Sequence, residues 1–346
     1  MKTSIPSYIS SLYSREHALL NIYLTNQCNL QCRHCATNSG PLETSFLNVD
    51  QEAVAAMRLA ITRNHIEGMH ISGGEPFLRR GDLRNLAALA RETGILMAIN
   101  SNGFWGTSVP AAVSLLDSMK GITELILSTD EYHAEFLSSS KLIVAARAGL
   151  ECGLLVSVVS TTPDRNPTAY SAGIEEALSA AGLAGAVKHH YQALGPSARK
   201  EPIKEHVQFM SPALPRGRCN RLNRPTVIEN GSVLACCNTT IAKKCERSPL
   251  NLGRMDEAPL GELLDRAKGN HLLQALRTLG PAILAEALPD ELRSSLPKFY
   301  PKDDICALCS ELMVDEQLVA HLGGELHTGS LKNLLTGALM LRAAPA

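Results

Sequence analysis

The chain has 346 residues, and at about 100–200 residues per domain this length predicts two domains or one large domain with an appendage. The composition is 45% hydrophobic and 19% charged, which excludes a disordered or collagen-like chain. Lys and Arg total 33 against 34 for Asp and Glu, so the basic excess that a nucleic-acid or anionic-membrane binder needs is missing. No apolar run reaches the roughly 18–20 residues of a membrane span, and the N-terminus lacks the apolar core of a secretory signal. We expect a cytoplasmic protein with no nucleic-acid and no membrane partner.

Cysteine is the unusual component of the composition. The ten cysteines are Cys28, Cys32, Cys35, Cys152, Cys219, Cys236, Cys237, Cys245, Cys306 and Cys309. In a reducing cytosol they are not expected to form structural disulfides. Clustered thiols in such a chain indicate metal or redox chemistry.

Strand-like and helix-like segments alternate through the first two hundred residues. The predicted strands are short apolar runs bounded by turn residues, at Leu19–Thr25, Gly68–Ser72, Ile95–Asn100, Leu125–Thr129, Leu154–Ser160 and Val187–Gln192. The predicted helices lie at Val49–Asn64 (with Asn48 or Asp50 as cap), Leu83–Glu92, Ala111–Lys120, Ala134–Ala148 and Ala172–Ala181. Serial βα units predict an α/β fold with a parallel sheet, either an open doubly wound sheet or an incomplete barrel. In both, functional groups gather at the C-terminal ends of the strands.

The βα pattern stops at Gly195-Pro196-Ser197, and six of the ten cysteines follow it. We therefore predict an N-terminal segment at 1–18, a βα domain at 19–205, a cysteine-rich domain at 206–312 and a helical tail at 313–346.

The first cysteine cluster directly follows the first predicted strand, at Cys28, Cys32 and Cys35. Three thiols in eight residues can ligate three corners of a cluster that takes four cysteines in its fully ligated form. An open fourth position suggests chemistry rather than structure, by analogy with catalytic metal sites. The alternatives are a zinc knuckle with His34 as the fourth ligand, or unligated thiols.

The spacing CxxxCxxC on the loop after the first strand resembles the radical S-adenosylmethionine (radical SAM) family. Ser72-Gly73-Gly74-Glu75-Pro76, at the end of the second strand, is similar to the GGE motif of that family. The resemblance implies a partial (β/α)6 TIM-type barrel in which Gly73, Gly74 and Glu75 hold the amino group of S-adenosylmethionine (SAM). Glycines let the backbone approach a ligand closely, and an ammonium group needs acceptors.

Further matches place polar groups at successive strand ends. Asn100–Gly103, Leu127–Asp130 and Gln192–Arg199 resemble the TNG-like, SxD and GR-type segments of the family. The resemblance implies Asn102, Ser128, Ser157 and Arg199 as cofactor-binding residues, and it places Asp130 and His133 on the substrate side of a catalytic site that also contains Cys28, Cys32 and Cys35. His34 and Arg33, inside the loop, are expected to tune the cluster.

A second set of cysteines follows in the C-terminal part, at Cys219, Cys236, Cys306 and Cys309. Four thiols complete a tetrahedral metal site or a cubane site, and the spacing fits both zinc and [4Fe-4S]. The segment is similar to the SPASM/twitch extension of radical SAM enzymes, which implies one auxiliary [4Fe-4S] cluster. Cys237 competes with Cys236 as a ligand, and Cys245 is left without an assigned role, the alternatives being a ligand, a hydrogen donor or no function. Cys152 is expected to be a buried small hydrophobe.

The resemblance implies an enzyme in which a [4Fe-4S] cluster, reduced by a donor such as flavodoxin or ferredoxin, cleaves SAM to a 5′-deoxyadenosyl radical that abstracts a substrate hydrogen atom. An auxiliary cluster favours net oxidation, and the leading hypothesis is a maturase that forms a crosslink, thioether or altered stereocentre in a ribosomally made peptide. Against it, 27 residues before Cys28 leave little room for a peptide-recognition domain. The alternatives are a dehydrogenase or epimerase of a small molecule such as a sugar or aminocyclitol, and a non-catalytic iron–sulfur redox or binding protein.

Overall fold

The chain divides into two compact units. The computed structural model describes residues 8–13, 15–194, 210–238, 247–301 and 304–343. Unit 1 comprises residues 1–207 and 227–231, and unit 2 comprises residues 208–226 and 232–346. The predicted domain boundary after residue 205, the predicted cofactor-binding residue Arg199 and the unassigned Cys245 lie outside the described residues.

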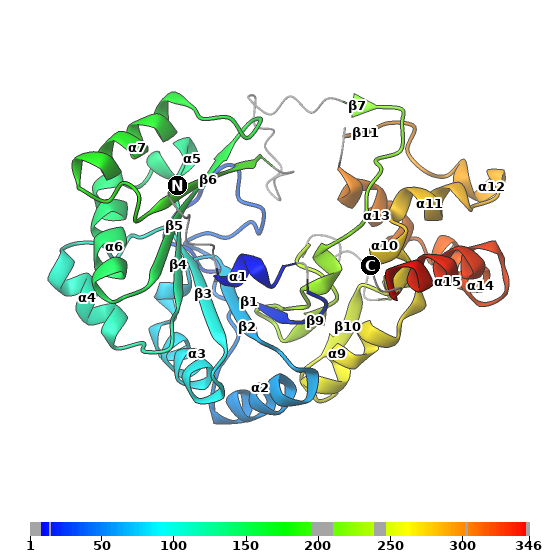
Figure 1. The fold of residues 1–346 in the computed structure, drawn as a ribbon, viewed down its shortest axis with the longest axis horizontal. Coiled ribbons are helices and arrows are strands. Elements are labelled where there is room, and N and C mark those ends of the chain that lie inside the picture. The colour runs from blue at the N-terminus through cyan, green and yellow to red at the C-terminus, as the bar shows by residue number, and fades with distance from the viewer. Residues whose placement is uncertain (1–7, 14, 195–209, 239–246, 302–303, 344–346) are drawn as a thin grey trace. The chain divides into compact units, whose positions relative to one another are not determined.

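Six strands of unit 1 form a curved sheet in which neighbours in the chain are neighbours in space (Figure 1). They are β1 (Leu19–Thr25), β2 (Gly68–Gly73), β3 (Leu96–Ser101), β4 (Glu124–Ser128), β5 (Leu155–Thr162) and β6 (Lys188–Ala193). Each pair from β1·β2 to β5·β6 is parallel. The six predicted strands are confirmed, and their ends shift by at most two residues.

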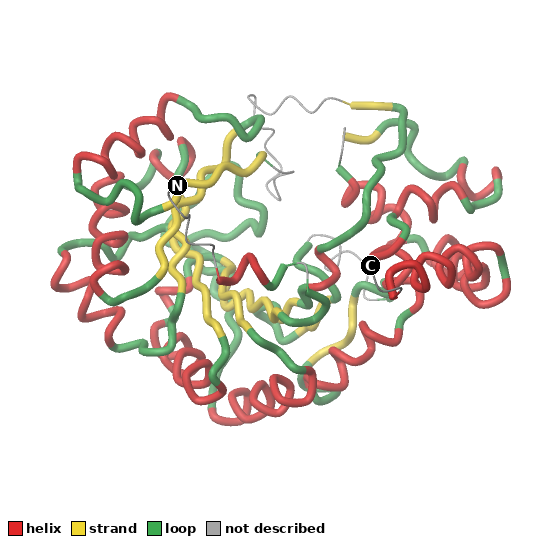
Figure 2. Tube along the Cα trace, in the orientation of Figure 1, coloured by secondary structure: helices red, strands yellow, loops and turns green. Residues whose placement is uncertain are grey.

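Helices cover the outer face of this sheet (Figure 2). The helical elements of unit 1 in this region are α2 (Gln51–Asn64), the 3-10 helix η1 (Pro76–Leu78), α3 (Arg80–Thr93), α4 (Val109–Asp117), α5 (Glu131–Ala134), α6 (Ser139–Glu151) and α7 (Ala169–Ala180). Unit 1 is therefore α/β with a parallel sheet and the arrangement of a partial (β/α)6 barrel, as predicted. The cap of α2 is Asp50, whose carboxylate accepts the backbone N–H of Ala53 at 2.9 Å.

One predicted helix is wrong in its extent. The segment expected to be a single helix at 134–148 is broken into α5 and α6. Ser138 ends the break by accepting the backbone N–H of Ser140 at 3.3 Å, which starts α6. Three consecutive serines favour such local hydrogen bonds over a helix interior, and the apolar periodicity hid this competition.

A short helix, α1 (Tyr8–Ser11), packs on the inner face of the sheet near the N-terminal ends of the strands. Ile9 and Leu12 join Leu19, Ala98 and Ile126 in one buried apolar cluster. The backbone N–H of Ile9 donates to the buried carboxylate of Glu124 at 3.1 Å. Apolar side chains thus fill the lower part of the inner face, and the polar groups of that face lie toward the C-terminal strand ends.

Unit 2 is mainly helical. Its short strands are β7 (Met210–Ser211), β9 (Ser232–Leu234), β10 (Asn251–Arg254) and β11 (Tyr300–Pro301), paired antiparallel as β9·β10 and β7·β11, while β8 (Thr226–Val227) falls where the chain passes between units. Its helices are the 3-10 helix η2 (Arg221–Asn223), α9 (Leu260–Gly269), α10 (His271–Thr278), α11 (Pro281–Glu286), α12 (Asp290–Arg293), α13 (Ile305–Val314), α14 (Glu316–Thr328) and α15 (Ser330–Ala343). None of the helices in the described part of the chain is both long enough and apolar enough to span a membrane.

The helix layer of unit 1 should be sensitive to loss of core volume. Leu86 of α3 is fully buried, so Leu86→Ala is expected to destabilise unit 1 by about 2–5 kcal/mol. Leu59 of α2 is 73% exposed, so Leu59→Ala is the matched control, expected to change stability by less than about 0.5 kcal/mol. The single tryptophan, Trp105, is buried in unit 1, so its fluorescence during urea unfolding measures both variants. Equal unfolding midpoints for the two variants would contradict this packing.

Candidate functional site

The loop that carries Cys28, Cys32 and Cys35 leaves the C-terminal end of β1 and closes on itself. Its two ends are joined by backbone hydrogen bonds from Cys28 to Gly40 at 3.1 Å and from Gly40 to Asn26 at 3.2 Å. Within the loop the N–H of Cys35 donates to the carbonyl of Cys32 at 3.2 Å. The predicted thiols are therefore presented from one compact turn at the strand end.

The Gly-Gly segment after β2 is pressed against the start of this loop. The N–H of Gly74 donates to the carbonyl of Thr25 at 2.6 Å, and the N–H of Glu75 donates to the carbonyl of Gln27 at 2.8 Å. A Cβ on Gly73, whose φ is +123°, would lie 2.5 Å from the Thr25 oxygen, and one on Gly74 would lie 2.1 Å from the Gln27 oxygen. Both glycines are thus required for the backbone of β2 to support the cysteine loop.

Glu75 and Asn102 connect the ends of β2 and β3 to the same loop. The buried carboxylate of Glu75 accepts the backbone N–H of Asn102 at 2.8 Å, the hydroxyl of Ser101 at 2.9 Å and the N–H of Phe77 at 3.1 Å. The Asn102 amide donates to the side-chain oxygen of Asn29 at 3.0 Å and lies 3.9 Å from the sulfur of Cys28. Burial raises the pKa of Glu75 to about 7, although these hydrogen bonds act to lower it.

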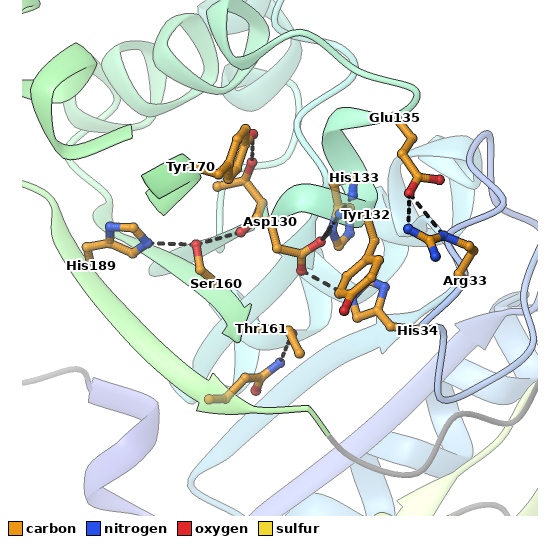
Figure 3. Close-up of polar contacts among 12 residues, drawn as sticks. Arg33, His34, Asp130, Tyr132, His133, Glu135, Ser160, Thr161, Tyr170 and His189 are labelled. Carbon is orange, nitrogen blue, oxygen red and sulfur yellow. Dashed lines mark hydrogen bonds and ion pairs between the residues drawn. The ribbon is translucent and has the colours of Figure 1, made fainter. Parts of the chain in front are cut away.

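Asp130, at the end of β4, holds the loop from the other side (Figure 3). One carboxylate oxygen accepts the backbone N–H groups of Tyr132 and His133, at 3.1 and 3.0 Å, and lies 2.8 Å from His133 Nδ1. The other oxygen lies 3.1 Å from His34 Nε2. Burial would raise the pKa of Asp130, but the charges and hydrogen bonds of His133 and His34 outweigh it and hold that pKa well below its ordinary value. The carboxylate therefore stays ionised and is fully used by these partners.

Arg33 and His34 add contacts between the loop and the start of α5. The ring of His34 stacks on Tyr132 with centroids 4.6 Å apart. The guanidinium of Arg33 donates to Glu135 at 2.7 Å and lies 5.3 Å from the centroid of the Tyr132 ring. Figure 3 shows these side chains grouped around Tyr132. His34, Asp130 and His133 also lie close enough to hold a metal ion, but the hydrogen-bonded geometry already accounts for the carboxylate.

The surroundings of the three thiols fit a bound iron–sulfur cluster. Backbone N–H groups of Leu30 and Ser39 donate to the sulfurs of Cys28 and Cys35 at 3.4 and 3.3 Å, which is the kind of hydrogen bond that stabilises cluster thiolates. Burial, together with the charges of Asp130, Cys28 and Cys35, raises the pKa of Cys32, so its thiolate needs a bound cation. The Nδ1 atom of His34 is buried and has no hydrogen-bond partner among the described residues, which leaves it available to a group held here.

Ser128 and Ser157, the remaining predicted cofactor residues that the structure describes, lie on the inner face of the sheet. Alternation along the strands places Ser128 on the side of Ile126, and Ser157 on the side of Val159, which packs on the apolar cluster beneath. His70 and Asn100 share this face and are joined by a contact of 2.9 Å between Nε2 and Oδ1. Sequence reasoning missed this pair, which the period-two alternation of β2 and β3 could have indicated.

A polar chain on the outer face resembles a catalytic triad but serves the fold. Ser160 Oγ lies 2.8 Å from His189 Nε2, and His189 Nδ1 lies 3.5 Å from Glu175 on α7. The Ser160 hydroxyl is fully buried, and it donates to the carbonyl of Thr129 at 2.6 Å. A serine without exposure cannot attack a substrate, so the chain joins β4, β5 and β6 to α7.

Unit 2 brings the second set of predicted thiols together. Cys219, Cys236, Cys306 and Cys309 all line one small pocket, together with Arg221, Leu222, Asn238, Leu250, Pro281 and Ile305. Cys306 and Cys309 lie in α13, whose first turn is capped by Asp304 through a 3.0 Å hydrogen bond from the N–H of Cys306. Cys237 is not among the lining residues.

The thiols of this pocket also fit a bound cluster or metal ion. Burial, with repulsion from neighbouring thiols, raises the pKa of Cys236 and Cys309, and burial raises that of Cys306 to about 11. Buried thiols this close together cannot all ionise in an empty pocket, whereas a metal centre deprotonates its thiol ligands. Cys152, by contrast, lies at the end of α6, with its sulfur 3.9 Å from the carbonyl of Val113.

Comparisons with known proteins show what part of unit 1 is similar to. Residues 22–143 match the family model of the Radical SAM superfamily. The chain is 31% identical over 126 residues to the "Putative peptide biosynthesis protein YydG" of Bacillus subtilis (36% of this chain and 39% of that one), and 27% identical over 192 residues to the GTP 3′,8-cyclase of Streptomyces coelicolor (52% of each). The matches thus span about half or less of these relatives. Members of that superfamily are enzymes that bind a [4Fe-4S] cluster and SAM.

Solved structures share the fold. The structure of "Native anSMEcpe with bound AdoMet and Cp18Cys peptide" superposes with a TM-score of 0.52 at 14% identity, and the match covers 93% of this chain and 99% of that one.

Asp130→Asn should weaken the first cluster site selectively. An asparagine can keep the oxygen that accepts the Tyr132 and His133 N–H groups, but its NH₂ then faces His34 Nε2–H. The contact with His34 is lost because two donors cannot pair. Loss of such an outer contact typically costs about 10–100-fold in metal affinity. Iron release to a chelator, measured in a chain that also carries Cys306→Ala and Cys309→Ala, is expected to accelerate accordingly. Glu135→Gln is the control, since its exposed pair with Arg33 contributes less than about 1 kcal/mol. Release at the rate of the unsubstituted site would contradict the anchoring role.

The raised pKa of Glu75 predicts a pH dependence of unit 1 in the absence of cofactors. A folded-state pKa of about 7 against an ordinary 4.5 means that the folded protein binds more protons between these values. The stabilising contribution of Glu75 to the free energy of unfolding is fully present below about pH 4.5 and is lost as the pH rises through about 7. Glu75→Gln should flatten this part of the profile of urea midpoints, followed by Trp105 fluorescence, and the exposed Glu52→Gln should leave it unchanged. An identical slope in Glu75→Gln and the parent would disprove the assignment.

Proposed function

Because the chain carries a radical SAM domain, we propose that the protein is a radical SAM enzyme that modifies a ribosomally made peptide oxidatively. The observation that carries the proposal is the pair of thiol sites, one of three cysteines at the end of β1 and one of four cysteines in unit 2. A three-cysteine site leaves one iron of a cubane open for a ligand, whereas a four-cysteine site is closed. The two sites therefore suit different tasks within one reaction.

In the first site, the residues of unit 1 hold and orient the cofactors. Cys28, Cys32 and Cys35 would ligate the cluster, and Gly73, Gly74 and Glu75 fix the loop that presents them. When bound and reduced, the cluster supplies the electron that cleaves SAM to a 5′-deoxyadenosyl radical, which abstracts a hydrogen atom from the substrate. An electron donor such as flavodoxin or ferredoxin would provide that electron.

The inner face of the sheet supplies the polar wall of the proposed cofactor and substrate site. Ser128 and Ser157 are candidates for the carboxylate or ribose of SAM, and the pair of His70 and Asn100 lies on the same face. Asp130 and His133 act by supporting His34 and the cysteine loop, which is the role that their contacts favour over direct contact with the substrate.

In unit 2, the four thiols would hold an auxiliary [4Fe-4S] cluster, as in a SPASM/twitch-type domain. A closed cluster can accept the electron that a substrate radical must lose, which favours a net oxidation such as a crosslink or thioether. The peptide substrate is supported by the similarity to YydG, which is named for peptide biosynthesis. The anSMEcpe structure also contains a bound peptide, but the likeness of this chain to that protein is one of fold alone.

The proposal is tested by SAM cleavage in anaerobically reconstituted, dithionite-reduced protein. Replacing Cys28, Cys32 and Cys35 with Ala is expected to abolish 5′-deoxyadenosine formation, because the cluster loses all three thiolates. Cys306→Ala with Cys309→Ala is expected to keep SAM cleavage and lose product formation. Cys152→Ala, which removes a thiol from neither site, is the matched control and should retain both activities.

Substrate class is tested with the same assay. A panel of short peptides should include at least one that raises 5′-deoxyadenosine formation and loses the mass of two hydrogen atoms, as the formation of a crosslink or thioether requires. Turnover with sugars or aminocyclitols and with no peptide would instead favour a small-molecule oxidoreductase. Absence of 5′-deoxyadenosine from a fully loaded protein would favour a non-catalytic iron–sulfur protein.

A further inference from the structure

One charged side chain lines the pocket of four cysteines in unit 2. Among the described lining residues, Arg221 alone carries a charge, and the rest are the four thiols, Asn238 and apolar side chains. Four thiolates outweigh the positive charge of an iron–sulfur core, so a cluster ligated here is anionic. A fixed cation beside it stabilises the reduced form more than the oxidised form, because the reduced form carries one more negative charge.

Arg221 is held in place by its position in the chain and by Cys237. It begins η2, two residues after Cys219, and it is an exposed residue. Its Nη1 atom donates to the sulfur of Cys237 at 3.7 Å. The negative charges of Cys237, Cys306 and Cys219 favour the charged guanidinium and raise the pKa of Arg221 further, against the opposing effect of burial. The guanidinium is thus within electrostatic reach of the pocket thiols.

The same contact distinguishes the surroundings of two neighbouring cysteines, Cys236 and Cys237. Cys236 is buried and lines the pocket, whereas Cys237 does not line it and receives the Arg221 hydrogen bond. A carboxylate also lies close to the thiols: Asp304 acts to raise the pKa of Cys306, and its side chain caps α13. Among the described residues that line the pocket, Arg221 is therefore the one whose charge opposes the negative charge of the site.

We propose that Arg221 is a positioning residue of the auxiliary site, which raises the reduction potential of the cluster bound by Cys219, Cys236, Cys306 and Cys309 and keeps Cys237 outside the ligand set. This inference rests on the proposed auxiliary [4Fe-4S] cluster. Net charge and hydrogen bonds near the sulfurs are the protein's means of setting such potentials. A higher potential makes the cluster a better acceptor for an electron from a substrate radical.

The test is a potentiometric titration of the full chain carrying Cys28→Ala, Cys32→Ala and Cys35→Ala, in which the auxiliary cluster is the one that remains. Absorbance of the cluster gives the midpoint, and electron paramagnetic resonance of the reduced form gives its signature. Arg221→Gln is expected to lower the midpoint potential by at least about 59 mV. For a one-electron couple this shift corresponds to a tenfold change in the ratio of oxidised to reduced cluster at a given potential. Arg221→Lys keeps the positive charge, so its midpoint potential should lie close to that of the parent.

Arg247→Gln is the matched control, because Arg247 lies in the same unit, is exposed and pairs with Glu316. Its midpoint should equal that of the parent. An Arg221→Gln cluster with an unchanged midpoint and iron content would overturn the role of Arg221 while leaving the auxiliary cluster in place. A parent that binds no iron and no acid-labile sulfide once the first three cysteines are replaced would overturn the auxiliary cluster of the proposed function, and this inference with it.

Discussion

Crowding of thiols is the constraint on which the rest of the structure depends. A single buried cysteine is a small hydrophobe, but several thiols brought together resist ionisation through burial and mutual repulsion. Both units create this situation, around Cys32 in unit 1 and around Cys236 and Cys309 in unit 2. Such an arrangement becomes favourable when a metal centre supplies the missing positive charge. Each unit then adds its own support: N–H donors and a buried carboxylate in the first, and a guanidinium in the second.

The supports of the first site come from segments that are distant in sequence but end at the same edge of the sheet. Parallel strands bring their C-terminal ends together, so β2 contributes Glu75, β3 contributes Asn102 and β4 contributes Asp130 to a loop that follows β1. Each contact is a hydrogen bond of a buried polar group, and leaving such a group without a partner would cost its full desolvation free energy. The motif residues are thereby explained as much by support of the loop as by contact with a ligand.

The sequence predicted the order and type of the strands because apolar runs bounded by turn residues are local signals, and it predicted both thiol sets because cysteine is rare and its spacing is informative. It placed Asp130 on the substrate side, which stays a prediction, and nothing local indicates the contact of its second carboxylate oxygen with His34, almost a hundred residues earlier. The break after Ala134 was missed because serine capping competed with apolar periodicity. Arg221 and the pair of His70 and Asn100 are ordinary residues in sequence, and their significance arises from which side chains the fold places beside them.

The loop that follows β1 is tied at both ends, at Gln27 by Glu75 and at Gly40 by Asn26 and Cys28. The number of residues between these ties is therefore a structural quantity in its own right. Adding or deleting one residue inside them would rotate the remaining thiols out of register even if every cysteine were kept. Insertions and deletions of residues within the tied segment should accordingly be selected against.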